Sequence, residues 1–185
     1  TEQTVAPPRG KIQLDESGKP NGILEDCGSL TAKFLPSASV SESVYLDSLV
    51  TLLRHYNACG ITSIFERGSN AEGMRTYQKL REQNRLTVRA TVTIRVPTDK
   101  SLEGAEDAIR KLTVKPGEGD AWVKAGPLKL SVDGGVLYGT AFMREPYGKN
   151  SFGLYGISDP QYRGLLQHTP EEVKNFVRAG HKLGW

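Results

Sequence analysis

The chain has 185 residues, and a domain of about 150 residues already hides about two thirds of its unfolded surface, so one core of its own is expected. Its 24 basic and 21 acidic residues give a net charge of +3 and are interspersed, which argues against nucleic-acid binding. No apolar run approaches the about 20 residues that span a bilayer, and residues 1–10 lack the apolar core of a signal peptide. We therefore expect a soluble, cytoplasmic chain without membrane contacts.

Turn-forming residues separate two short apolar pairs near the N-terminus. Ile12/Leu14 and Ile23/Leu24 flank the turn formers of residues 17–22, which include two glycines and a proline. Short apolar segments on either side of such a turn predict a small β-hairpin.

The middle of the chain alternates between helical and strand patterns. Apolar residues recur every three or four positions in three segments, and β-branched residues mark two of the segments between them as strands. In chain order, the patterns predict a helix over 40–59, a strand over 60–66, a helix over 69–84, a strand over 86–96, a helix over 102–112 and a strand within 122–132, best matched by 127–132. Ser39 and Ser69 each precede a glutamate by three residues, which is the spacing of a capping box.

A long segment without periodicity, residues 136–167, follows the last predicted strand. An ordered loop of that length in a compact domain is usually functional. It is followed by a strong helix signal, in which Thr169 is the cap, Pro170 the first helical residue, Glu172 the third residue of a capping box and Gly184 the stop.

Helices that alternate with strands form right-handed βαβ units, whose strands lie parallel in one sheet. The fold class is therefore α/β. We expect residues 1–185 to form one domain, with a hairpin and loop region over 1–38 and βα units over 39–185. The last helix ends where the pattern requires another strand, so we expect the chain to be part of a longer protein.

Three residues at predicted strand ends are candidates for chemistry, because ligands of α/β folds bind outside the carboxyl ends of the strands. Lys129 interrupts an apolar strand, so its ammonium must pair with a carboxylate such as Asp133, reach solvent at the strand end, or be chemically modified. Glu66 and Asp133 are candidate substrate-binding carboxylates, although ordinary ion pairing or loop capping would also explain them.

The remaining signals are weaker. His55, His168 and His181 lie in or beside predicted helices without metal-pair spacing, and we interpret them as structural. Cys27 and Cys59 likewise form no metal-type pair and are interpreted as reduced thiols. A nucleophile elbow and a phosphate-binding loop are both absent from the sequence, which gives no support to a serine hydrolase or a nucleotide-binding protein.

Several segments, in order and at matching intervals over nearly the whole chain, resemble the YtcJ-like amidohydrolase 3 family. That family includes N-substituted formamide deformylases and exoenzyme regulatory proteins of the AepA type. The segments that carry the resemblance are Gly10-Lys11-Ile12, Asp15-Glu16-Ser17-Gly18-Lys19-Pro20-Asn21-Gly22-Ile23-Leu24-Glu25, Gly60-Ile61-Thr62-Ser63, Gly126-Pro127-Leu128-Lys129-Leu130-Ser131-Val132-Asp133-Gly134 and Glu145-Pro146-Tyr147.

The resemblance implies part of a (β/α)8 TIM barrel, with the predicted strands as the second, third and fourth of the barrel. It also implies a metal-dependent hydrolase of non-peptide, amide-type carbon–nitrogen bonds in small molecules, with a divalent metal, zinc foremost, in the full-length protein. Lys129 takes the fourth-strand position, where many members of the superfamily carry a carboxylated lysine as a metal ligand. The family's histidine ligands and its eighth-strand aspartate have no counterpart here, so we expect the chain alone to bind no metal and to be inactive.

Two functional hypotheses remain open. The first is a fragment of an amidohydrolase, and the second is a non-enzymatic α/β binding or regulatory module that uses the loop of residues 136–167. Strands removed from a closed barrel expose unpaired edges, so the first hypothesis also predicts self-association of the isolated chain through the strand of residues 86–96 or 127–132.

Overall fold

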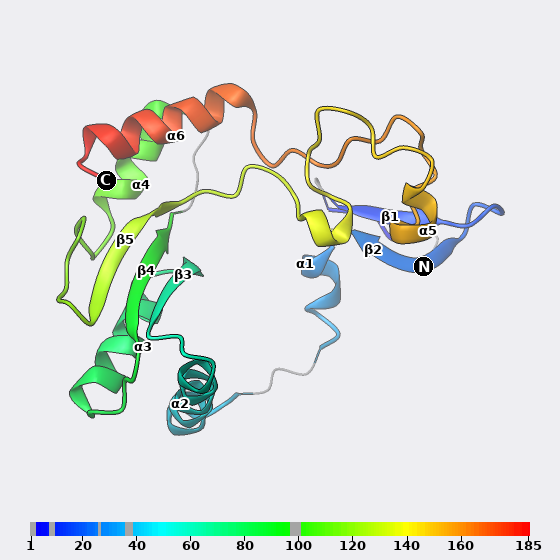
Figure 1. Cartoon of the computed structure of the whole chain (residues 1–185). Helices are drawn as coiled ribbons and strands as arrows, with labels where there is room; N and C mark the ends of the chain where they lie inside the picture. Colours follow the sequence, from blue (N-terminus) through cyan, green and yellow to red (C-terminus); the bar gives the residue numbers. More distant parts are fainter. Residues whose placement is uncertain (1–2, 8–9, 26, 36–38, 97–100) are drawn as a thin grey trace. The chain divides into compact units, whose positions relative to one another are not determined.

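The computed structural model describes residues 3–7, 10–25, 27–35, 39–96 and 101–185, which fall into two compact units (Figure 1). Unit 1 comprises Thr1–Ser39 and Asp133–Gln167, and unit 2 comprises Val40–Val132 and His168–Trp185. The segment 133–167 therefore groups with the hairpin region, although the sequence pattern placed it among the βα units. No helix of the described residues is both long and apolar enough to cross a membrane.

Unit 1 contains the predicted hairpin. Its strands β1 (Lys11–Leu14) and β2 (Pro20–Glu25) pair antiparallel. The Asp15 carboxylate accepts hydrogen bonds from the Ser17 and Lys19 N–H groups at 2.8 and 3.0 Å, which fixes the turn between the strands. The unit also contains three short helices: α1 (Gly28–Thr31), η1 (Val136–Tyr138) and α5 (Ser151–Tyr155).

Unit 2 contains the predicted alternation of helices and strands. Its elements are α2 (Glu42–Ala58), β3 (Ser63–Ser69), α3 (Ala71–Glu82), β4 (Arg89–Arg95), α4 (Leu102–Arg110), β5 (Val123–Lys129) and α6 (Pro170–Lys182). The strands form one parallel sheet in the order β3-β4-β5, which confirms the α/β class.

The helix ends follow the capping chemistry, with two corrections. Ser41 and Asn70, rather than Ser39 and Ser69, cap α2 and α3, because their extended backbones let the side chains accept hydrogen bonds from N–H groups of the first turn. The capping box of Thr169 and Glu172 at the start of α6 is confirmed in full.

The third strand lies within residues 122–132 as predicted, but it begins four residues before the best-matched segment 127–132. β5 begins at Val123 because Val123 and Ala125 pair with the buried Ala90 and Val92 of the central strand. The apolar residues of 127–132 suggested the later start. However, Pro127 has no N–H to donate to a ladder, and the strand ends two residues after it.

One face of the sheet carries the main core. Side chains alternate between the two faces of a strand, so Ala90, Val92 and Ile94 of β4 share the face that meets α2 and α3. This cluster contains the fully buried Leu53, Met74 and Leu80 of the two helices. On the opposite face, Phe65 of β3 is 52% exposed and belongs to neither core cluster of the described residues.

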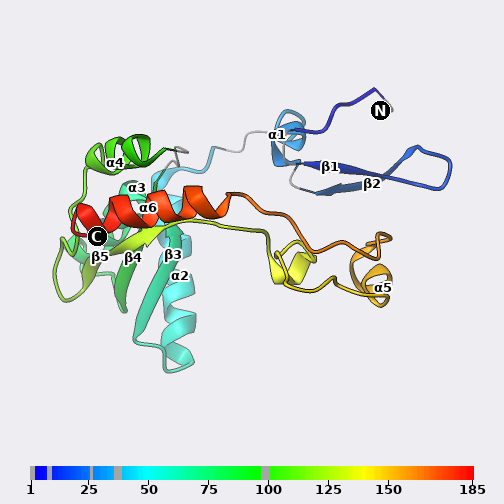
Figure 2. The same cartoon turned by 90° about the horizontal axis from the view of Figure 1, so that it is seen from above.

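A second core lies between α4 and α6, which pack side by side (Figure 2). Ala105 and Ile109 of α4 meet Phe176 and Ala179 of α6. Glu106 on the rim accepts hydrogen bonds from Lys182 at 2.8 Å and Arg110 at 2.9 Å. These two cations hold the pKa of Glu106 below its ordinary value, so the carboxylate ties the helices together as an anion at neutral pH.

The packing of α2 gives a direct test of the core. Leu53 is 0% exposed, whereas its neighbour Leu52 is 44% exposed. We expect Leu53→Ala to lower the free energy of unfolding by about 2–5 kcal/mol, because it removes buried methyl groups and leaves a cavity. Leu52→Ala is the matched control and should cost less than about 1 kcal/mol. Urea unfolding of both variants measures the difference, and equal losses would contradict this core.

Candidate functional site

The carboxyl ends of the three parallel strands lie at one edge of the sheet in unit 2. β3, β4 and β5 end at Ser69, Arg95 and Lys129, and Arg95 is the register partner of Lys129. Active sites of parallel α/β folds form at this edge. We therefore take it as the candidate site.

Lys129 projects from the face that lies opposite the core. Its neighbour Leu128 packs against both core clusters, and successive side chains of a strand point to opposite faces. Lys129 itself is half-buried, and it forms no ion pair with the described residues. The ammonium thus lies at the strand end, unpaired with any carboxylate among the described residues. Its assignment as a metal ligand stays a prediction.

Arg95 is the site residue that sequence reasoning missed. It follows the buried Ile94, so it lies on the same face as Lys129, one strand away. The strict alternation of residues 86–96 could have identified it. This alternation places Arg95 at the end of the strand, on the face that does not carry the apolar residues. Two cationic side chains therefore lie next to each other at the edge.

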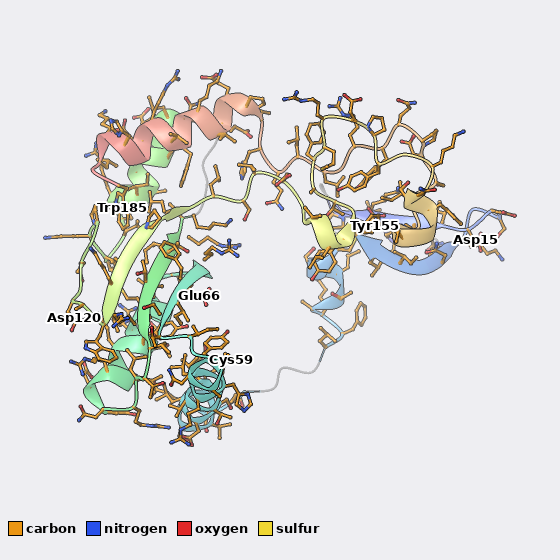
Figure 3. The ribbon with its side chains drawn as sticks, viewed as in Figure 1. Asp15, Cys59, Glu66, Asp120, Tyr155 and Trp185 are labelled. Atoms are coloured by element: carbon orange, nitrogen blue, oxygen red, sulfur yellow. The ribbon has the colours of Figure 1, made fainter. Side chains whose placement is uncertain are left out.

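Glu66 lies three residues before the end of β3, which corrects its predicted position at the strand end. Its carboxylate reaches toward the carboxyl end of its own strand and accepts a hydrogen bond from the Gly68 N–H at 3.1 Å. A Cβ atom at Gly68 would lie 3.9 Å from both Glu66 Oε1 and Arg95 Nη2, so both groups lie near this glycine, but they form no ion pair with each other. Glu66 is the middle residue of β3, and Figure 3 labels it beside that strand.

Asp133 belongs to unit 1, where it organises the loop. Its carboxylate accepts a hydrogen bond from the Phe142 N–H at 2.8 Å, and its backbone forms a bridge with Leu166. Asp133 therefore joins the two ends of the segment 133–167. This is the loop-capping role that the sequence left open for it, and its role in substrate binding stays a prediction.

The described residues do not form a complete metal site. They contain no group of three or more His, Cys, Asp or Glu side chains placed to hold a metal ion. His55 and His181 lie in α2 and α6, and His168 Nδ1 lies 3.6 Å from the Glu172 carboxylate at the start of α6. Cys27 and Cys59 are both free thiols. A lysine alone cannot provide the three or more protein ligands of a typical site.

Comparison with known proteins agrees with this architecture. The model of the amidohydrolase family, Amidohydro_3, matches residues 1–185. The chain belongs to the amidohydrolase family. A search of curated proteins gave no match.

Two solved structures are similar to this amidohydrolase-family chain. An uncharacterized metal-dependent hydrolase from Pyrococcus horikoshii OT3 is 18% identical with a TM-score of 0.59, over 94% of this chain and 32% of that one. An uncharacterized metal-dependent hydrolase from Pyrococcus furiosus is 17% identical with a TM-score of 0.58, over 94% of this chain and 33% of that one. The chain thus has their fold and spans about a third of their length.

Tyr77 gives a pH test of the packing behind the site. Burial under the sheet, aided by the negative charge of Glu66, raises the pKa of Tyr77 to about 12 from its ordinary 10.0. The folded state therefore holds this proton more tightly than the unfolded state does, so stability is intact below pH 10 and falls as the pH rises from about 10 to 12.

We expect Tyr77→Phe to remove part of this alkaline loss of stability, because phenylalanine has no proton to release. Urea midpoints of both proteins between pH 9 and pH 12 measure it. Tyr138, which is 78% exposed, supplies the control variant Tyr138→Phe, and this change should leave the alkaline slope as it is. Identical slopes for Tyr77→Phe and the unchanged protein would show that Tyr77 is not buried as described.

Proposed function

We propose that this chain forms part of a metal-dependent hydrolase that cleaves amide-type, non-peptide carbon–nitrogen bonds in small molecules. The observation that carries the proposal is the family match over residues 1–185, together with Lys129 at the carboxyl end of β5. Within the family, the motifs around residues 10–25 and 126–134 favour the YtcJ-like group, which includes the formamide deformylases.

The sheet has the features that part of a (β/α)8 barrel requires. Its strands are parallel, lie in sequence order and are joined by helices. Helices cover one face, as they cover the outside of such a barrel, and the opposite face would line the interior. We propose that β3, β4 and β5 are its second, third and fourth strands.

Lys129 would join the site as a carbamate. Its neutral amine adds to carbon dioxide, which forms an N–C bond and releases one proton to solvent. The product carries one negative charge, shared by two oxygens, in place of a cation, and Arg95 in the adjacent register position can neutralise that charge. A bound divalent metal, which we expect to be zinc, would activate water and polarise the amide carbonyl.

The described residues do not complete such a metal site, so we derive no catalytic step through the metal. We propose instead that its other ligands come from a longer protein, consistent with the chain spanning about a third of its structural neighbours. Glu66 and Asp133 remain proposed substrate-binding residues. Glu66 has the stronger case, because its carboxylate and Arg95 both lie near Gly68 at the candidate edge.

The decisive experiment uses a protein in which this sequence is continued at both ends. We expect divalent-metal-dependent hydrolysis of N-substituted formamides, and a loss of about 100-fold or more for Lys129→Ala, since even indirect partners of metal ligands are worth about 10–100-fold. Lys174→Ala is the control, because Lys174 lies on α6 paired with Glu171.

A small carboxylic acid added to Lys129→Ala should restore part of the activity by replacing the carbamate. A long protein that neither binds metal nor depends on Lys129 would overturn the proposal.

Unit 1 supports a second candidate function, a ligand-binding module. A cavity of about 430 Å³ lies between the hairpin and the segment 137–157, and its lining includes Gln13, Leu154 and Tyr155. The Gln13 amide donates a hydrogen bond to Glu25 at 2.7 Å, which provides a polar group at an otherwise mainly apolar wall. This volume suits a small molecule. A coding sequence limited to these 185 residues would favour this candidate.

We also propose that the isolated chain self-associates through a sheet edge. The sequence analysis predicted the strand of residues 86–96 as one possible contact. That prediction was wrong, because β4 is the central strand and is paired on both sides. The edges are β3 and β5. Of these, β3 is the better candidate, since β5 contains Pro127, which cannot donate to an added strand.

Sedimentation at micromolar concentration tests this contact. We expect a concentration-dependent dimer that Phe65→Lys weakens, because a lysine on an edge strand opposes the approach of a second strand. Phe152→Lys is the control, since Phe152 is exposed in unit 1. A chain that sediments as a monomer at every concentration would rule the contact out.

A further inference from the structure

A second cavity lies in unit 2, at the amino ends of the strands. Its volume is about 430 Å³, and it opens beside the loop that leads into β5. β4 has seven residues and is therefore about 20 Å long. The length of this strand lies between the cavity and the candidate site at the carboxyl ends. In Figure 3, Asp120 lies near the amino end of β5. The lining residues are Ser63, Ile64, Arg89, Ala90, Thr91, Gly117, Gly119, Asp120, Ala121, Trp122 and Lys124.

The strand register brings two cations to this cavity. Ser63 is the register partner of Arg89, and Thr91 is the partner of Lys124. Arg89 and Thr91 are two residues apart on one strand, so the four side chains share one face of the sheet. Arg89 and Lys124 are thus diagonal neighbours, and long side chains in that relation can reach a common ligand.

The two carboxylates of the adjacent loop accept hydrogen bonds from the loop's own backbone N–H groups. Asp120 accepts hydrogen bonds from the Trp122 and Val123 N–H groups at 2.7 and 2.8 Å, and Glu118 accepts one from the Lys115 N–H at 2.9 Å. The positive charge of Arg81, which stacks on the Trp122 ring at 5.0 Å, adds to the stabilisation of Asp120 as an anion. Asp120 keeps its negative charge, so the two lining cations, Arg89 and Lys124, exceed the lining anions by one charge.

The two cations differ in how they are held. The Arg89 guanidinium donates hydrogen bonds to Ser63 Oγ at 3.0 Å and Thr62 Oγ1 at 3.5 Å, which orient it without neutralising it. Lys124 forms no ion pair with the described residues. An oriented guanidinium beside an ammonium matches a doubly charged oxyanion, because each cation can meet its own anionic oxygen. Ile64, Ala90 and Trp122 are also among the lining residues.

We propose that this cavity is a binding site for a small organic phosphate monoester, with its phosphoryl group between Arg89 and Lys124 and its organic part beside Trp122. The volume exceeds that of a bare phosphate ion and fits a small organic group as well. The site is distinct from the proposed hydrolytic site, since the two lie at opposite ends of the strands. Its occupancy requires no metal.

Phenyl phosphate is the probe, and the 185-residue chain is titrated with it at low salt while the indole N–H signals of Trp122 and Trp185 are followed by NMR. We expect saturable binding that shifts Trp122 and weakens as salt rises. Lys124→Gln and Arg89→Gln should each weaken it about 10-fold, the effect of losing one charge-assisted contact of about 1.4 kcal/mol. Benzoate, with one charge, should bind more weakly than phenyl phosphate.

Arg75→Gln and Lys174→Gln are matched controls, because both cations lie on helices and pair with glutamates of their own helix. They should bind phenyl phosphate like the unchanged chain. Arg89→Gln removes the hydrogen bond to Ser63 of β3, so its thermal melting is measured in parallel. Lys124 forms no ion pair with the described residues, so Lys124→Gln tests the proposal without the loss of such a contact. Absence of saturable binding, or equal affinity in Lys124→Gln and the controls, would overturn the proposal.

Discussion

The parallel pairing of β4 with both of its neighbours is the constraint on which unit 2 depends. β4 buries Ala90, Val92 and Ile94 on the face that meets α2 and α3. Because the side chains of a strand alternate, this burial also decides what the other face presents. Arg89, Thr91 and Arg95 face away from the main core as a direct consequence. The same strand register therefore determines both the packing of the core and the side chains of the candidate site.

That register separates two environments along the strands. At the carboxyl ends, Arg95 and Lys129 lie side by side, and Glu66 approaches from β3. At the amino ends, Arg89 and Lys124 line a cavity beside a loop whose own carboxylates are engaged. This separation follows from the parallel arrangement, because the carboxyl ends of the three strands lie at one edge of the sheet and their amino ends lie at the other. One sheet can thus carry two sites that do not share residues.

Unit 1 is built by different interactions. Its hairpin is fixed by the Asp15 turn, and the long segment is closed on itself by Asp133, whose carboxylate and backbone both bind within it. Tyr147 adds to this closure, since its hydroxyl donates to the Ala141 carbonyl at 2.8 Å and its ring meets Tyr155 edge-on. The segment is therefore an ordered structure, although it lacks any periodic pattern in the sequence.

The sequence by itself determined the order of helices and strands, the parallel α/β class, the hairpin and the capping box of Thr169 and Glu172, because each of these depends on residues close together in the chain. It also placed Lys129 in a strand, although the end of that strand at Lys129 came from the structure. The tertiary structure decided the rest. The start of β5 depended on Val123 pairing with Ala90, the position of Glu66 depended on how far β3 pairs, and Arg95 became a site residue only beside Lys129. Each of these is a contact between segments separated by more than twenty residues, and a local pattern contains no information on which distant partner a strand will pair with.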